Sequence, residues 1–217
     1  LFKEDNARQY FRSLKREPSP AKAAPKPGRT DGLSAEQQRA VEHGEGPALV
    51  LAGPGTGKTH TLTARIALLV RERGVPPDQI LAVAFTNKAA REMRERLQAL
   101  LDRDALAKLR ICTFHAFGLS LLKQFGPRIG LTWPFAILDE EEQGQLLASL
   151  APKGKPMVET LRAAKQAFRA PEQLEDPQAA ELLRRYETAL NEQNAVDLDD
   201  LIRLPVQLLE RDPQALE

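Results

Sequence analysis

The chain has 217 residues, of which 42% are hydrophobic and 28% charged, and its formal net charge is +1. This composition is ordinary for a soluble globular protein and by itself selects neither a fold class nor a function. No run approaches about 18 consecutive apolar residues, which excludes a membrane-spanning helix of that kind. The single cysteine, Cys112, excludes an intramolecular disulfide and is compatible with a reducing compartment such as the cytoplasm.

The front of the chain is a basic, proline-rich extension. Residues 1–30 carry eight Lys or Arg against three Asp or Glu, whereas residues 172–217 carry four against twelve. This asymmetry indicates that a polyanionic partner would contact the earlier part of the chain, although a solvated linker is the interpretation we favour for residues 1–30 themselves. Because the sequence lacks an initiator Met, we expect a fragment of a longer protein.

A capping box, a strand and a glycine-rich turn follow in order. Ser34 and Gln37 have the spacing of a capping box, which predicts a short helix that ends near Gly44. The apolar run at 48–51 predicts a strand over residues 48–52. It leads into the sequence Ala-Gly-Pro-Gly-Thr-Gly-Lys-Thr at 52–59 and then into an amphipathic segment. A strand, a glycine-rich loop and a helix start in this order predict a phosphate-binding loop.

The loop contains the residue types that polyphosphate binding requires. Glycines let the backbone curl tightly, Lys58 can reach the β- and γ-phosphates, and the Thr59 hydroxyl can ligate Mg²⁺. A plain glycine turn before a helix is the alternative that we do not favour. The loop residues expected to contact a nucleotide are Ala52, Gly53, Pro54, Gly55, Thr56, Gly57, Lys58 and Thr59.

Hydrophobic patterns predict the remaining elements. We expect a helix at 61–73 with Leu62, Ile66, Leu69 and Val70 on one face, a strand at 80–85 buried on both faces, a helix at 87–101, a strand at 109–113 and a further helix. Strands that alternate with helices in this way predict a parallel sheet with right-handed crossovers. Helical stretches at 140–150, 157–168 and 177–194 predict an all-helical subdomain, and a last helix is expected after it at 198–210.

Five segments in order resemble those of the UvrD/PcrA/Rep-like superfamily 1 DNA helicases. Residues 33–41 are similar to the adenine-reading Gln motif, residues 52–59 to the phosphate loop, residues 84–93 and 113–117 to two motifs that contact DNA, and residues 197–201 to a further family segment. The resemblance implies an α/β fold, a RecA-like P-loop NTPase with a parallel sheet and an all-helical inserted subdomain. The domain boundaries we expect are 31–120, 121–195 and 196–217, after the extension at 1–30.

The resemblance also implies ligands and roles. ATP and Mg²⁺ would be the cofactors, with Lys58 and Thr59 as the catalytic residues and Thr59 as the Mg²⁺ ligand. Gln37 and His60 would contact the nucleotide together with residues 52–59. The partners would be single-stranded DNA, junctions of single- and double-stranded DNA, a second RecA-like domain in the rest of the helicase chain, and repair or replication proteins, but no membrane. The implied DNA contacts are Phe85, Thr86, Asn87, Lys88, Thr113, Phe114 and His115.

Simpler interpretations stay open for several of these residues. The sole role of Gln37 could be to cap its helix, and Phe85 at a strand end could be a core residue. Phe117 is expected in the core, and a metal site at Cys112 and His115 is not expected because no further ligand pair accompanies them.

Two acidic stretches resemble catalytic carboxylates only in outline. Asp139, with Glu142 three residues later, fits a helix N-cap better than the Mg²⁺-binding motif that hydrolysis requires. Asp197, Asp199 and Asp200 likewise precede or begin a helix. In the family, the acidic motif lies a little after this segment, and the chain ends first.

These observations lead to a functional hypothesis with alternatives. We expect the N-terminal ATPase half of a DNA helicase, which alone binds nucleotide weakly and hydrolyses little or none. The motor of a helicase-nuclease and a regulatory module that binds nucleotide or DNA without motor activity are the alternatives.

Overall fold

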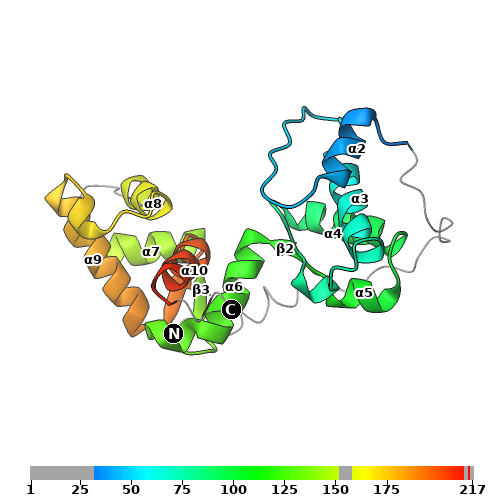
Figure 1. Cartoon of the computed structure of the whole chain (residues 1–217). Coiled ribbons are helices and arrows are strands. Elements are labelled where there is room, and N and C mark those ends of the chain that lie inside the picture. Colours follow the sequence, from blue (N-terminus) through cyan, green and yellow to red (C-terminus); the bar gives the residue numbers. More distant parts are fainter. Residues whose placement is uncertain (1–31, 152–157, 213–214, 216–217) are drawn as a thin grey trace. The chain divides into compact units, whose positions relative to one another are not determined.

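The computed structural model describes residues 32–151, 158–212 and 215, so the basic extension at 1–30 lies outside the described residues. The chain forms two compact units that divide between Thr113 and Phe114 (Figure 1). Each unit is described by itself below. No helix within the described ranges is both long and apolar enough to cross a membrane.

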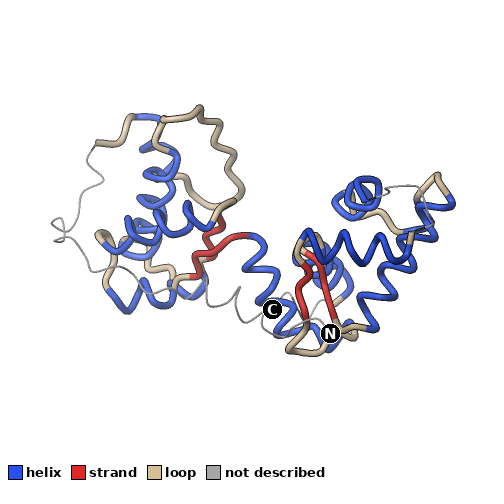
Figure 2. The backbone as a smooth tube through the Cα atoms, turned by 180° about the vertical axis from the view of Figure 1, so that it is seen from behind, coloured by secondary structure: helices blue, strands red, loops and turns tan. Residues whose placement is uncertain are grey.

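The first unit, residues 32–113, surrounds a two-stranded parallel sheet (Figure 2). Its elements are α2 (Ala35–Glu42), α3 (Lys58–Arg71), η1 (Pro77–Gln79), β1 (Leu81–Ala84), α4 (Asn87–Gln98), α5 (Arg103–Lys108) and β2 (Arg110–Thr113). β1 and β2 pair with Leu81 opposite Arg110 and Ala84 opposite Thr113. The connection through α4 and α5 allows the parallel pairing, because a tight hairpin can join only antiparallel strands. The predicted parallel arrangement of these two strands is confirmed.

The core of this unit lies between the sheet and helices α3, α4 and α5. The buried residues are Ile66, Ala67, Ala82, Ala84, Met93, Leu97, Leu101, Leu106, Leu109 and Ile111. Only one face of β1 is fully buried, because Leu81 is 43% exposed. The expectation that this strand is buried on both faces is therefore wrong. On α3, Ile66 is buried as predicted, but Leu62 is 41% exposed, and the buried face includes Ala64, Ala67 and Leu68 instead.

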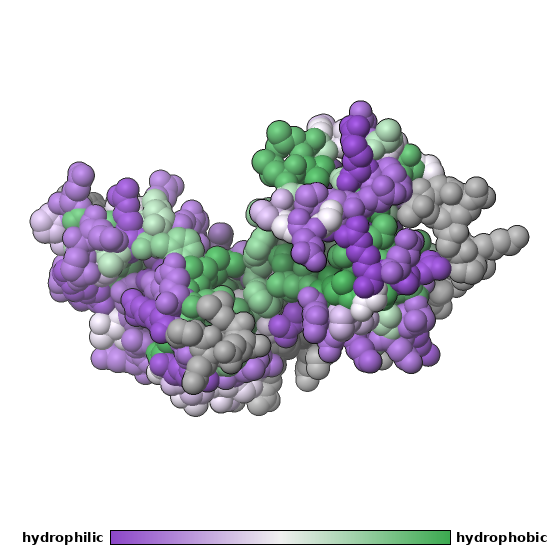
Figure 3. Space-filling view, in the orientation of Figure 1, coloured by the Kyte–Doolittle hydropathy of each residue, from purple (hydrophilic) through white to green (hydrophobic). Residues whose placement is uncertain are grey.

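The predicted strand at 48–52 is absent from the described structure. These residues form no regular element, and the side chains of Leu49 and Leu51 are 85% and 86% exposed. Figure 3 shows the resulting hydrophobic surface over the loop that precedes α3. A strand satisfies its backbone groups only through a neighbour. β1 pairs with β2, and no strand among the described residues pairs with 48–52. The apolar run thus has the composition of a buried strand, but the described residues provide no neighbouring strand for it to pair with.

The second unit, whose described residues begin at Phe114, is mainly helical. Its elements are α6 (Phe114–Phe125), η2 (Gly126–Ile129), β3 (Ala136–Leu138), α7 (Glu140–Leu150), α8 (Val158–Gln166), η3 (Pro171–Gln173), α9 (Pro177–Glu192), β4 (Ala195–Asp197) and α10 (Asp200–Arg211). The four helices predicted after residue 139 are present within a few residues of their expected bounds. β3 and β4 pair in parallel, with Ile137 opposite Val196.

Helices α6 and α10 pack at very close range inside this unit. A Cβ placed on Gly118 would lie 1.8 Å from the carbonyl oxygen of Leu201, far inside contact distance. Only glycine lets the two helix backbones approach in this way. The neighbouring core is formed by Leu119, Leu122, Leu131, Phe135, Ile137, Val196 and Leu201. α10 is therefore an integral part of the helical unit.

The compact units do not coincide with the predicted domain boundaries. Residues 114–120 lie on α6 and the segment from 196 onward contains α10, and both pack within the second unit. The predicted boundaries had placed both segments in the RecA-like domain. The compact units of this chain need not be the domains of a longer protein. The boundaries 31–120, 121–195 and 196–217 therefore stay a prediction for the domains of the longer protein.

Candidate functional site

The start of α2 is held by the predicted capping box. The Ser34 hydroxyl accepts a hydrogen bond from the Gln37 backbone N–H at 3.3 Å, and Gln37 Oε1 accepts one from the Ser34 N–H at 2.8 Å. The same Gln37 amide also reaches the glycine-rich loop, because its Nε2 donates to the Thr56 carbonyl at 2.8 Å. The structure thus confirms the capping interpretation of Gln37 and adds a contact with the loop.

The glycine-rich loop has a backbone that requires glycine at two positions. Gly55 and Gly57 have φ angles of 74° and 80°, in the left-handed region that side chains rarely adopt. Gly57 is the N-cap of α3, so Lys58 and Thr59 are the first two residues of that helix. A helix start presents unpaired N–H groups and the positive end of the dipole, and the first turn of α3 carries no acidic residue.

Lys58 folds back over the loop. Its Nζ lies 3.1 Å from the Ala52 carbonyl oxygen and 2.5 Å from that of Gly53, and the Thr56 hydroxyl donates to the same Gly53 oxygen at 2.8 Å. The loop is exposed, so an anion can approach Lys58 from solvent. The residues present fit a polyphosphate: a tight glycine backbone, a helix start free of carboxylates, an ammonium group, and a hydroxyl at Thr59 suited to Mg²⁺.

Arg65 of α3 and Arg73, which follows the end of that helix, fix α2 beside the loop. Arg65 donates to the carbonyls of Val41 and His43 at 2.8 Å and 2.6 Å, and its other nitrogen lies 3.3 Å from the Gly44 oxygen. Arg73 donates to the carbonyls of His43 and Glu42. The last carbonyls of a helix have no partner inside it, so these contacts cap the C-terminus of α2. Nothing in the sequence pattern indicated this anchor.

The second group of predicted site residues lies where β1 ends and α4 begins. Phe85 is 91% exposed, so its interpretation as a core residue is wrong. The Thr86 hydroxyl caps α4 by accepting a hydrogen bond from the Ala89 N–H at 3.1 Å. Asn87 and Lys88, the first two residues of α4, are exposed. An exposed ring beside a helix start and an ammonium group can stack on a base and contact a phosphate.

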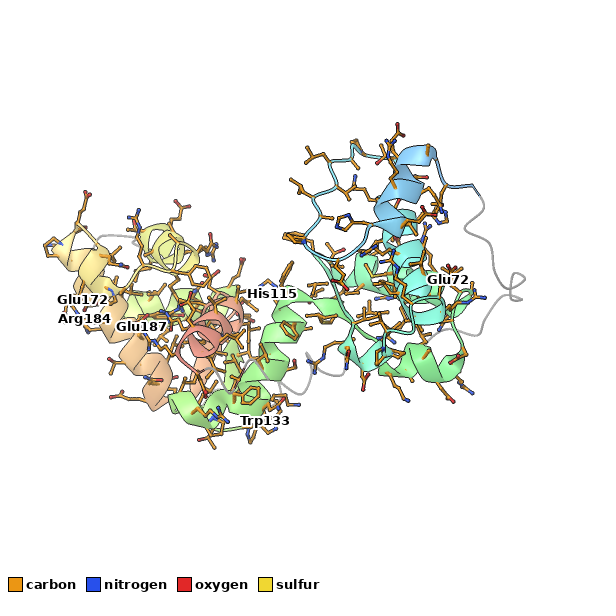
Figure 4. The ribbon with its side chains drawn as sticks, in the orientation of Figure 1. Glu72, His115, Trp133, Glu172, Arg184 and Glu187 are labelled. Carbon is orange, nitrogen blue, oxygen red and sulfur yellow. The ribbon has the colours of Figure 1, made fainter. Side chains whose placement is uncertain are left out.

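The third group falls on both sides of the division between the units. Thr113 ends β2 with 5% exposure, whereas Phe114 is 57% exposed at the start of α6. His115, labelled in Figure 4, is half-buried on the first turn of α6. The ring of Phe114 is thus accessible to a ligand, while the side chain of Thr113 is buried. Phe117, expected in the core, is half-buried.

His115 contributes to a polar pocket of about 220 Å³ within the helical unit. The lining residues are His115, Leu138, Asp139, Glu140, Gln143, Arg162, Gln166, Leu198 and Asp199. Asp139 acts here as a helix cap, as predicted. Its Oδ1 accepts from the backbone N–H groups of Glu141 and Glu142 at 2.9 Å each, and Glu142 returns a contact to the Asp139 N–H. These contacts confirm the N-cap interpretation of Asp139.

A buried ionic cluster lies next to this pocket, and the sequence analysis missed it. Lys165, Asp197 and Asp200 are each at most 2% exposed, and Lys165 Nζ contacts both carboxylates, at 2.5 Å and 2.8 Å. Tyr186 and Gln143 donate to Asp197 at 3.0 Å each. Lys165 is more than 30 positions from either aspartate, and the three residues lie on three different elements. Only the fold brings them together.

Charge and burial act oppositely on the two carboxyls. Burial alone would raise the pKa of Asp197. The Lys165 ammonium and the hydrogen bonds that the Asp197 carboxylate accepts hold this pKa below its ordinary value. Burial raises the pKa of Asp200, against the opposing charges of Lys165 and Arg203. Burial and the Asp197 charge also raise the pKa of Tyr186. Asp197 is thus the ionised centre of the cluster.

No cluster of three or more metal-ligating side chains occurs within residues 32–151 and 158–212. Burial raises the pKa of the Cys112 thiol, against the charges of Arg110 and Arg94. This thiol is therefore protonated more readily than an exposed one.

Comparison with known proteins identifies the family. The model of the UvrD/REP helicase N-terminal domain matches residues 33–217. The chain is 37% identical to the ATP-dependent DNA helicase PcrA of Leuconostoc citreum over 207 residues and 37% identical to that of Bacillus subtilis over 202 residues. It is 34% identical to PcrA of Staphylococcus aureus over 201 residues.

These alignments cover 85–86% of this chain but only 27% of each relative. The chain thus spans about a quarter of the length of the curated relatives it matches. The family match extends over both compact units and includes the glycine-rich loop at 52–59. The chain therefore belongs to the UvrD/REP helicase family, of which it contains the N-terminal domain with its P-loop NTPase class of fold.

Proposed function

We propose that this chain is the N-terminal, nucleotide- and DNA-binding part of an ATP-dependent DNA helicase. The observation that carries the proposal is the loop at 52–59, where two left-handed glycines lead into α3 with Lys58 and Thr59 in its first turn. PcrA helicases that are 34–37% identical over most of this chain give the proposal its reaction class.

The cofactors in this proposal are ATP and Mg²⁺. Lys58 neutralises the β- and γ-phosphates, Thr59 ligates the metal ion, and the backbone N–H groups of Gly53 and of residues 55–59 cradle the phosphates. Gln37 and His60 lie on either side of the loop in sequence and complete the proposed nucleotide site. ATP supplies a γ-phosphoryl group whose transfer to water releases the free energy for motion.

Single-stranded DNA is the proposed nucleic-acid ligand. The exposed Phe85 offers a stacking surface, and Asn87 and Lys88 offer an amide and a positive charge for a phosphate. Phe114 and His115 form a second proposed contact. The physiological substrates in this proposal are single-stranded DNA and its junctions with duplex, in a repair or replication process.

Hydrolysis requires groups that these residues do not supply. The acidic residue at Asp139 is used as a helix cap, and Asp197 and Asp200 are tied to Lys165 inside the helical unit. A general base, a second metal-binding carboxylate and an arginine finger would come from the second RecA-like domain and other parts of the helicase. The chain alone therefore binds nucleotide without sustained turnover, in our proposal.

A binding experiment tests the nucleotide site. Fluorescence anisotropy of a labelled ATP analogue with Mg²⁺ should show binding to the chain that Lys58→Ala abolishes. Lys108→Ala, an exposed lysine of the same unit on α5, is the matched control and should leave binding unchanged. Equal affinity of the wild type and Lys58→Ala would contradict the proposed site. Steady-state ATP turnover by residues 1–217 that Lys58→Ala removes would contradict the absence of hydrolysis.

A second experiment tests the DNA contact. Phe85→Ala should weaken the binding of labelled single-stranded DNA by about tenfold, as expected for the loss of one base-stacking contact. Leu62→Ala, another exposed apolar residue of the same unit at 41% exposure, serves as the control. Unchanged affinity in Phe85→Ala would remove the stacking proposal and leave the nucleotide site unaffected.

A further inference from the structure

We infer that Gln37 is a positioning residue for the phosphate loop, with a role that does not depend on the adenine base. This inference rests on the proposed nucleotide site and concerns how that site is kept ready for polyphosphate. The resemblance to helicases assigns Gln37 only to adenine. In the structure, its amide instead joins the start of α2 to the Thr56–Gly57 peptide, just before the N-cap residue of α3.

Both ends of the Gln37 amide are occupied. Oε1 accepts a hydrogen bond from the Ser34 N–H, and Nε2 donates one to the Thr56 carbonyl, each at 2.8 Å. The bond to Ser34 orients the amide, so that its NH₂ group faces the loop. The approach is close: a Cβ on Gly57 would lie 2.8 Å from this nitrogen. Glycine at 57 therefore serves the contact with Gln37 as well as the left-handed backbone.

The contact fixes the direction of one N–H group of the loop. The Thr56 carbonyl and the Gly57 N–H belong to one planar trans peptide, in which the two groups point in opposite directions. Because Gln37 holds the carbonyl toward α2, the Gly57 N–H points away from α2. A phosphate-binding loop works only when its N–H groups are oriented before the anion arrives. Gln37 thus contributes to the affinity for the phosphate chain itself.

α2 is a rigid support for this contact. Its start is fixed by the capping box, and its C-terminal carbonyls are fixed by Arg65 of α3 and by Arg73, just beyond the end of that helix. Val41 of α2 packs with Ala64 and Leu68 of α3 and is fully buried. The helix that carries Gln37 and the helix that carries Lys58 are therefore joined at several points, and the Gln37 amide extends this connection to the loop.

Inorganic tripolyphosphate separates the two roles of Gln37, because it has phosphates but no adenine. Isothermal titration calorimetry of the chain with Mg²⁺ and tripolyphosphate should show that Gln37→Met weakens binding by roughly threefold to tenfold, as expected for one lost orienting hydrogen bond. Ser34→Ala removes the other half of the capping box but keeps the Gln37 side chain. It should leave the tripolyphosphate affinity within about twofold of the wild type.

A second variant keeps the result interpretable if Gln37→Met disturbs α2. Gln37→Glu retains an acceptor for the Ser34 N–H but cannot donate to Thr56 when ionised, so it should also weaken tripolyphosphate binding. Gln38→Glu places the same charge at the next position and controls for electrostatic repulsion. A loss in Gln37→Glu that exceeds the loss in Gln38→Glu supports the inference.

The possible outcomes distinguish the inference from the proposed function. Loss of ATP affinity with unchanged tripolyphosphate affinity in both Gln37 variants would limit Gln37 to adenine and overturn the inference, while the nucleotide site would stand. Equal losses in Ser34→Ala and Gln37→Met would assign the effect to the helix start and also overturn it. If the wild-type chain binds neither ligand, the proposed function fails together with the inference.

Discussion

The Nζ atom of Lys165 lies 2.5 Å from Oδ2 of Asp197, and both side chains are 1% exposed. Asp200 accepts a second contact from the same ammonium group, and Arg203 contacts Asp200 in turn. Burial of so many charges is costly unless each is paired. The geometry meets this condition, and the cluster joins α8, β4 and α10, three elements that are separate in sequence.

Removal of Lys165 should destabilise the helical unit strongly. Lys165→Met leaves Asp197 buried with no cation in contact and should lower the free energy of unfolding by about 3–5 kcal/mol. The measurement is urea unfolding followed by the fluorescence of Trp133, the only tryptophan of the chain, which lies in this unit beside Phe135 (Figure 4). Arg162→Ala, one turn earlier on α8 with a 37% exposed side chain, should cost less than about 1 kcal/mol.

The pH dependence of stability should identify Asp197 as the ionised member. Its folded-state pKa is lowered, so its contribution to stability is complete above the unfolded pKa of about 4 and is lost as the pH falls through the folded value. Asp197→Asn cannot ionise, and the stability difference between wild type and variant should shrink as the pH is lowered from about 6 toward 3. A constant difference over this range would show that folding leaves the pKa of Asp197 unchanged, and a difference that grows as the pH falls would show that folding raises this pKa. The pKa of Asp200 is raised, so its contribution to stability changes with pH in the opposite direction. Asp200 is present in both proteins and is not changed by the substitution.

Gly118 should be irreplaceable at the crossing of α6 and α10. A methyl group there would meet the Leu201 carbonyl at 1.8 Å, so Gly118→Ala must separate two helix backbones and should cost about 3 kcal/mol or more. Gly144 on α7 has open space around its Cβ position, and Gly144→Ala should instead stabilise the unit by about 0.5–1 kcal/mol through helix propensity. Trp133 fluorescence during urea unfolding measures both. Equal changes in the free energy of unfolding for Gly118→Ala and Gly144→Ala would contradict the close approach of α6 and α10 at Gly118.

The sequence predicted best those features that depend on neighbours three or four positions away. Both predicted capping boxes, at Ser34 and at Asp139, are present, because Gln37 and Glu142 lie one turn further along the same helix. The helices from 140 onward were also predicted within a few residues. These patterns depend on local periodicity, which the chain carries wherever it folds.

Features that depend on distant partners were missed. The strand at 48–52 was wrong because its composition describes a buried strand, whereas pairing depends on a neighbour that the described residues do not provide. The partnership of Lys165 with Asp197 spans 32 positions, and that of Arg65 with His43 spans 22. A carboxylate before a helix looks the same in sequence whether it caps the helix or pairs with a buried lysine.

The anchoring of α2 by Arg65 leads to a last prediction. Arg65→Ala leaves the carbonyls of Val41, His43 and Gly44 without this donor, and the free energy that protects α2 from opening should fall by about 1–3 kcal/mol. Hydrogen exchange of the α2 amides is the appropriate measurement, because it reports local opening that global unfolding conceals. Arg71→Ala on the same helix, whose hydrogen bond to the Leu100 carbonyl is 3.4 Å long, should leave the exchange in α2 unchanged. Because α2 carries Gln37, the Arg65 variant should also bind tripolyphosphate more weakly, whereas unaltered exchange together with unaltered binding would show that α2 is held by its apolar contacts alone.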